Sequence, residues 1–161
     1  MAERKSNTLE APADRTLVIT RVFDAPRPLV FAAWTKKEHL DRWCAPQGFV
    51  IESSGGDLRV GGKWHSRMIA PNGEKFPVSG VYREIVENER LVFTHIWEPD
   101  PGEAPHETVV TVRFADEGSK TRMTFEQAIF KSVESRDGHN GGWTQCFEQL
   151  DGLLSELKEK K

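Results

Sequence analysis

Residues Trp143 to Lys158 read WTQCFEQLDGLLSELK, and apolar side chains recur in this segment at every third or fourth position. That spacing places them on one face of an α-helix about 24 Å long. Glutamine, glutamate, aspartate and lysine occupy the other faces. The segment therefore predicts a long amphipathic helix that buries one side, made of Trp143, Cys146, Phe147, Leu150, Leu153, Leu154 and Leu157.

The residues before this helix are rich in glycine. Gly138, Gly141 and Gly142 fall within six positions, and each glycine weakens a helix by roughly 1 kcal/mol relative to alanine. We therefore expect the helix to begin near Trp143, after a turn that contains His139. This turn is either simply exposed to solvent or a gate that moves, with Trp143 as an aromatic cap over the pocket.

The middle of the chain alternates between apolar and polar residues, which is typical of half-buried strands. An Asn-Gly pair at 72–73 predicts a tight hairpin turn. Two short helices are expected at 27–34 and 36–43. The expected strands are 16–24, 49–54, 63–70, 76–86, 90–98, 107–115 and 120–129, with 58–60 continuing the second strand beyond a break at Gly55-Gly56.

Strands joined by short turns form an antiparallel meander, and its apolar face needs a cover that only the long helix is large enough to provide. The sequence therefore predicts an α+β fold in which a curved antiparallel sheet of six to seven strands wraps around the C-terminal helix. The space between sheet and helix is the first place to look for a ligand. Residues 1–14 are polar and aperiodic, so we expect a disordered leader followed by one domain over 15–161.

Composition excludes several classes of protein. The chain has 161 residues, with 22 basic and 25 acidic side chains and a net charge of −3, which argues against a nucleic-acid binder. No apolar run approaches a membrane span or a secretion signal, so we expect a cytoplasmic protein without membrane insertion. Cys44 and Cys146 are too few for a disulfide framework, and no motif has metal-ligand or cofactor spacing.

Six short motifs carry a resemblance to a known family. The chain resembles the START-like superfamily, also called SRPBCC or helix-grip, over about residues 15–157. Within it, the chain is similar to the group related to the activator of the heat-shock-protein-90 ATPase (AHSA-type). The motifs are Val22-Phe23-Asp24-Ala25-Pro26, Val30-Phe31-Ala32-Ala33-Trp34, Asp57 to Trp64, Gly80 to Ile85, Glu89 to Thr94, and Gly142-Trp143.

The resemblance implies a helix-grip fold and a small hydrophobic or aromatic ligand held in a cavity between sheet and helix. Five tryptophans fit that expectation, although large aromatic side chains also fill ordinary hydrophobic cores. Gln127 lies on an apolar strand face, so its amide needs a partner from protein, water or ligand. The candidate ligand-binding residues are Trp34, Trp64, Met68, Tyr82, Phe93, His95, Trp97, Phe125, Gln127, His139, Trp143 and Phe147.

Two other functions remain open at this stage. The first is a cyclase-like or hydrolase-like enzyme that uses His95, Glu84 or Tyr82 for proton transfer, although no catalytic motif supports it and the facing of the middle strands is undetermined. The second is a stress-related homologue of the chaperone activator. That activator carries an additional N-terminal domain for which 161 residues leave no room, so a chaperone partner is not expected. A homodimer formed through an edge strand is compatible with the sequence.

Overall fold

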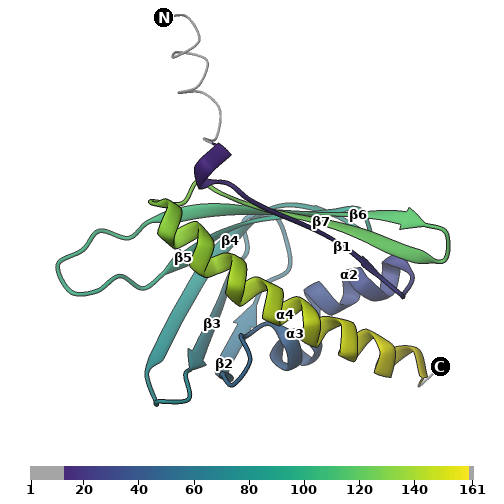
Figure 1. Cartoon of the computed structure of the whole chain (residues 1–161), viewed down its shortest axis with the longest axis horizontal. Coiled ribbons are helices and arrows are strands. Elements are labelled where there is room, and N and C mark those ends of the chain that lie inside the picture. The colour runs from purple at the N-terminus through teal and green to yellow at the C-terminus, as the bar shows by residue number, and fades with distance from the viewer. Residues whose placement is uncertain (1–12, 160–161) are drawn as a thin grey trace, which may run out of the picture.

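A computed structural model describes residues 13–159 and consists of one antiparallel sheet that curves around a long helix (Figure 1). The sheet has seven strands in the order β1-β7-β6-β5-β4-β3-β2. Strands β2 to β7 follow one another as a meander, and β1 closes the other edge by pairing with β7. The predicted α+β helix-grip fold is confirmed.

The strands correspond closely to the predicted segments, because apolar and polar side chains alternate along them and turn residues separate them. Between β1 and β2 the chain forms two short helices, α2 (Arg27–Thr35) and α3 (Lys37–Trp43), as expected. The strands are β1 (Leu17–Phe23), β2 (Val50–Gly56), β3 (Lys63–Ile69), β4 (Lys75–Val86), β5 (Arg90–Trp97), β6 (Glu107–Glu117) and β7 (Lys120–Ala128).

Helix α4 (Val133–Glu159) crosses the concave face of the sheet (Figure 1). The prediction that it begins near Trp143 is wrong, since the glycine-containing segment is helical as well. The side chain of Ser132 accepts a hydrogen bond from the backbone N–H of Ser135 at 3.0 Å, which satisfies a donor in the first turn. Tertiary packing therefore outweighs the weak helix propensity of three glycines.

The region around Gly55 and Gly56 also differs from the expectation. Both glycines stay in β2, where they pair with His65 and Trp64, and a bulge lies earlier, between Ile51 and Ser53. Residues 58–60 lead into a turn instead of continuing the strand, and Gly61 in that turn has a φ of 86°. Glycine lacks a Cβ, so it adopts this conformation without steric cost.

The predicted leader, residues 1–14, lies outside the described residues except for its last two positions. These two belong to a short 3-10 helix, η1 (Ala13–Arg15). Within residues 13–159, no helix is both long enough and apolar enough to cross a membrane.

The buried core has two parts. The larger lies between α2, α4 and strands β1, β5, β6 and β7, and includes Phe23, Phe125 and Phe147. The smaller lies near β2, β3 and β4, and consists of Ala45, Met68 and Val78. Trp64 packs against both clusters. The sheet and helix therefore meet tightly on one side of the molecule and leave space on the other.

Candidate functional site

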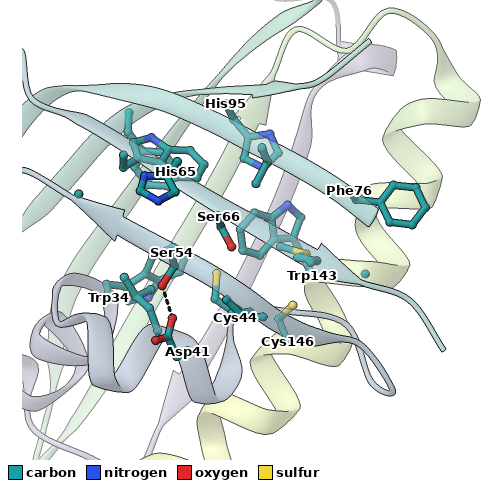
Figure 2. Close-up of a pocket in the computed structure, with 18 of the residues that line it drawn as sticks. Trp34, Asp41, Cys44, Ser54, His65, Ser66, Phe76, His95, Trp143 and Cys146 are labelled. Carbon is teal, nitrogen blue, oxygen red and sulfur yellow. Dashed lines mark hydrogen bonds between the residues drawn. The ribbon is translucent and has the colours of Figure 1, made fainter. Parts of the chain in front are cut away.

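A pocket of about 550 Å³ lies between the concave face of β2 to β5 and the helices α3 and α4 (Figure 2). Most of its lining is apolar. Aromatic side chains come from five different elements: Trp34 from α2, Trp64 from β3, Tyr82 from β4, Phe93 from β5 and Trp143 from α4. Its size falls within the usual range for small-molecule sites, roughly 300–1,000 Å³.

Trp64 of β3 is held in the wall of the pocket by β5, the strand beyond its neighbour β4. Its indole Nε1 donates a hydrogen bond of 3.1 Å to the backbone carbonyl of Thr94, passing over Gly80. A Cβ at position 80 would lie 2.5 Å from that nitrogen and 1.9 Å from the Thr94 oxygen. Gly80 therefore allows the indole to lie flat against the backbone, with its ring 5.6 Å from that of Phe93.

His139 and Trp97 join the helix to the sheet at one end of the pocket. Nε1 of Trp97 donates to Nε2 of His139 at 2.8 Å, and Nδ1 of His139 lies 2.7 Å from the carbonyl oxygen of Ser135. These two contacts fix the imidazole with its proton on Nδ1. Phe130 packs against the same ring at 4.8 Å. His139 is thus a helical residue that lines the pocket, and not a residue of a turn before the helix.

A chain of buried hydrogen bonds positions Trp143. Its indole Nε1 donates to Oε1 of Gln127 at 2.8 Å, and Nε2 of Gln127 donates to Oγ1 of Thr108, also at 2.8 Å. Thr108 in turn donates to the backbone oxygen of His95. The amide of Gln127 is therefore satisfied by protein groups and orients a pocket wall from behind.

Burial keeps four ionisable groups of the pocket, His95, His139, Tyr82 and Cys44, uncharged near neutral pH. Desolvation lowers the pKa of His95 to about 3, with a smaller contribution from His139, and desolvation also lowers the pKa of His139. Burial raises the pKa values of Tyr82 and Cys44 to about 12 each. A neutral, aromatic interior of this kind favours an apolar guest over an ion.

Charged side chains are found at the rim. Nζ of Lys37 lies 2.6 Å from Oδ2 of Asp41, and Oδ1 of the same carboxylate accepts a hydrogen bond from Ser54 (Figure 2). The side chain of Lys37 is 61% exposed. Its charge is therefore compensated outside the apolar interior.

Nine of the twelve predicted residues line the pocket, and three do not. Phe125, Gln127 and Phe147 are fully buried behind the wall, where Phe125 packs at 4.7 Å from Trp143. The nine lining residues are Trp34, Trp64, Met68, Tyr82, Phe93, His95, Trp97, His139 and Trp143. Whether these nine contact a ligand stays a prediction.

Glu84 is not part of the pocket lining. A bulge between Tyr82 and Glu84 shifts the register of β4 against β5, and Glu84 instead pairs with Arg90 with 45% of its side chain exposed. Of the three groups considered for acid–base chemistry, only His95 and Tyr82 meet in the pocket. Among the described residues, no three metal-binding side chains come together.

Sequence reasoning missed several lining residues. Cys146 lies on the apolar stripe of the long helix, so its inward direction was readable from the spacing. Cys44, Phe49 and Phe76 come from loops or strand ends, where no periodicity indicates direction. Gly142 also lines the pocket, on the same helix face as Cys146. Cys44, Phe49 and Phe76 therefore reach the pocket through tertiary structure that their local sequence does not encode.

Comparison with known proteins gives one family and many similar structures. Residues 24–155 match the protein family described as Activator of Hsp90 ATPase homolog 1-like protein. No match was found among curated proteins.

Three solved structures illustrate the likeness. A protein from Chromobacterium violaceum is 28% identical with a TM-score of 0.80, over 87% of this chain and 96% of that one. A protein from Nitrosomonas europaea is 26% identical with a TM-score of 0.77, over 92% of this chain and 99% of that one. The AHSA1 protein from Silicibacter pomeroyi, 24% identical with a TM-score of 0.78 over 87% of this chain and 97% of that one, shares the fold.

Proposed function

The chain belongs to the family of Activator of Hsp90 ATPase homolog 1-like proteins, and on that premise we propose that it binds a small hydrophobic or aromatic molecule. The observation that carries the proposal is the pocket of about 550 Å³ with its largely apolar, aromatic lining. A site of this shape removes an apolar molecule from water at roughly 25 cal/mol per Å² of buried surface. The proposed location is the cytoplasm, where Cys44 and Cys146 stay reduced.

The enzyme alternative has less support. An imidazole whose pKa is about 3 is a poor general base, and a phenol whose pKa is about 12 is a poor acid at neutral pH. Glu84 does not line the pocket with them, because it follows the bulge in β4 and pairs with Arg90. The family description refers to the Hsp90 ATPase, whereas the observation that supports our proposal is the pocket.

Adjacent glycines on α4 offer a matched pair of variants. Gly142 lines the pocket, and a Cβ there would make an ordinary contact of 3.7 Å with Pro46. Gly141 is exposed, and a Cβ there meets nothing within 4 Å. Replacement by leucine at either position raises helix propensity, by roughly 0.5–1 kcal/mol. Only the leucine at 142 enters the pocket.

The test is a fluorescence titration with N-phenylnaphthylamine, an uncharged aromatic probe that brightens in apolar sites. We expect saturable binding to the wild type, a loss of about tenfold or more in affinity for Gly142→Leu, and a change below about twofold for Gly141→Leu. Absence of saturable binding to the wild type, or equal binding by the two variants, would refute the proposed site.

A further inference from the structure

His95 is a polar side chain directed into an aromatic end of the pocket. It comes from β5, is 5% exposed and lines the pocket, where Figure 2 shows it above Ser66. Four rings surround it: Trp97 at 5.2 Å, Trp64 at 5.8 Å, and both His139 and Trp143 at 6.2 Å between centroids. The surroundings of the imidazole, apart from the pocket space itself, are therefore aromatic.

The neighbouring rings have already used their hydrogen-bonding nitrogens. The partners are the Thr94 carbonyl for Trp64, His139 for Trp97, Gln127 for Trp143, and both Trp97 and the Ser135 carbonyl for His139. By contrast, no hydrogen bond to the ring nitrogens of His95 occurs within the described part of the chain. At this end of the pocket, the imidazole of His95 therefore keeps a free donor and a free acceptor.

A neutral imidazole has one N–H donor and one bare nitrogen acceptor. A guest that displaces water from these nitrogens without replacing its hydrogen bonds incurs a cost, so a guest that supplies a matching oxygen gains affinity that an all-carbon guest does not. The hydroxyl of Ser66, which lines the same pocket, is buried without a partner among the described residues. The unused hydrogen-bonding capacity thus extends from β5 to β3.

The charge of the lining argues against an anionic guest. Lys37, the lysine of the lining, is already paired with Asp41 at the rim. Burial keeps the His95 ring neutral, because desolvation lowers its pKa. A carboxylate at this end would therefore lose its hydration without meeting an opposite charge.

We propose that the ligand is an uncharged molecule with an apolar, ring-sized body and one hydroxyl or carbonyl oxygen, and that this oxygen hydrogen-bonds to the imidazole of His95. This inference rests on the proposed function and specifies the ligand chemistry of the same pocket. His95 is then a specificity-determining residue, since it distinguishes an oxygenated guest from its parent hydrocarbon.

The test compares fluorene, fluorenol, fluorenone and fluorenecarboxylate as competitors of bound N-phenylnaphthylamine. The four share one ring system and differ in the group offered to His95. The protein variants are wild type and His95→Phe, which keeps an aromatic ring and removes both nitrogens. We expect His95→Phe to lower the affinity for fluorenol or fluorenone by about five- to tenfold and to leave the affinity for fluorene unchanged or higher. Fluorenecarboxylate should be the weakest competitor of the wild type.

Each outcome separates this inference from the function on which it rests. If His95→Phe changes fluorene and its oxygenated relatives equally, the role of His95 is overturned while the pocket remains a binding site. If fluorenecarboxylate competes best, the uncharged ligand class is overturned. If the wild type binds neither the fluorescent probe nor any competitor, the proposed function itself fails.

A measurement on the wild type alone tests the same hydrogen bond if the variant does not fold. Long-range ¹H–¹⁵N NMR spectra resolve the two ring nitrogens of each histidine. We expect fluorenol to shift the His95 nitrogen signals strongly and fluorene to leave them nearly in place. Equal shifts with the two compounds would overturn the proposed hydrogen bond.

Discussion

Nε1 of Trp97 and Nε2 of His139 lie 2.8 Å apart, so a hydrogen bond joins the last residue of β5 to the second turn of α4. The acceptor is the unprotonated nitrogen of a neutral imidazole, because Nδ1 donates to the Ser135 carbonyl. A second proton on His139, at Nε2, would face the N–H of Trp97, so that two donors would meet without an acceptor. The contact between helix and sheet at this end of the pocket therefore depends on the imidazole staying neutral.

Acid should destabilise the protein through its buried histidines. The folded-state pKa of His95, about 3, lies below the unfolded value of 6.5, and the pKa of His139 is also lowered. The contribution of these two histidines to the free energy of unfolding is therefore fully present above about pH 6.5, and it is lost as the pH falls toward their folded-state pKa values. For His95 alone we expect a loss of about 2 kcal/mol between pH 7.5 and pH 5.

Urea unfolding of the wild type and His95→Phe across this pH range measures the effect. The variant should show a smaller fall in unfolding free energy between pH 7.5 and pH 5, whatever its stability at neutral pH. Parallel pH profiles for the two proteins would show that His95 is not held neutral by burial.

Gly80→Ala should be strongly destabilising. The added methyl group would overlap the Thr94 carbonyl oxygen, at 1.9 Å, and approach Nε1 of Trp64, at 2.5 Å. Both the pairing of β4 with β5 and the Trp64 hydrogen bond would have to shift, at a cost of about 3 kcal/mol or more.

Gly152→Ala is the matched control, because a Cβ at this exposed helical position meets nothing within 4 Å. It should stabilise the protein by roughly 0.5–1 kcal/mol. Denaturant midpoints of the two variants provide the comparison. Similar stability for both would contradict the close approach of Trp64 to the β4 backbone.

Gln127→Leu should release the Trp143 ring. The substitution leaves the buried indole N–H of Trp143 without an acceptor and removes the hydrogen bond that Thr108 accepts, while Thr108 still donates to the His95 carbonyl. We expect a loss of about 2–3 kcal/mol in unfolding free energy. In ¹H–¹⁵N spectra, the Trp143 indole signal should move upfield, whereas that of Trp43, which donates to the Ala33 carbonyl, should stay in place. An unmoved Trp143 signal would be inconsistent with the hydrogen bond to Gln127.

Neither cysteine should react readily in the folded protein. Burial raises the pKa of Cys44 to about 12, with a further contribution from Asp41, and burial also raises the pKa of Cys146. The thiolate is the reactive form, so at pH 8 we expect labelling by a disulfide reagent about a thousandfold slower than for a free thiol. Unfolding in urea should restore the ordinary rate at both residues. Rapid labelling of the folded protein would mean that the pocket admits water freely to these thiols.

Segments in which apolar side chains recur at a regular spacing predicted the fold, whereas residues outside such segments did not. The Trp143–Leu157 stripe predicted the buried face of α4, whereas alternation along the middle strands did not determine whether Trp64, Phe93 and His95 face the pocket. The start of α4 could not be predicted, because it depends on the Ser132 cap and on the contact of His139 with Trp97. The outward direction of Glu84 also depends on a bulge, which shifts the side chains after it relative to the neighbouring strand.

The position of β1 beside β7 has a consequence for synthesis on the ribosome. Leu17 of β1 pairs with Gln127 of β7, so β1 cannot pair with its neighbour until most of the chain has been translated. The apolar face of the sheet is covered later still, because α4 is synthesised after β7. Such long-range pairing delays folding and prolongs the exposure of apolar surface. Completion of this fold is therefore a late event in translation, and the nascent sheet stays uncovered until α4 emerges.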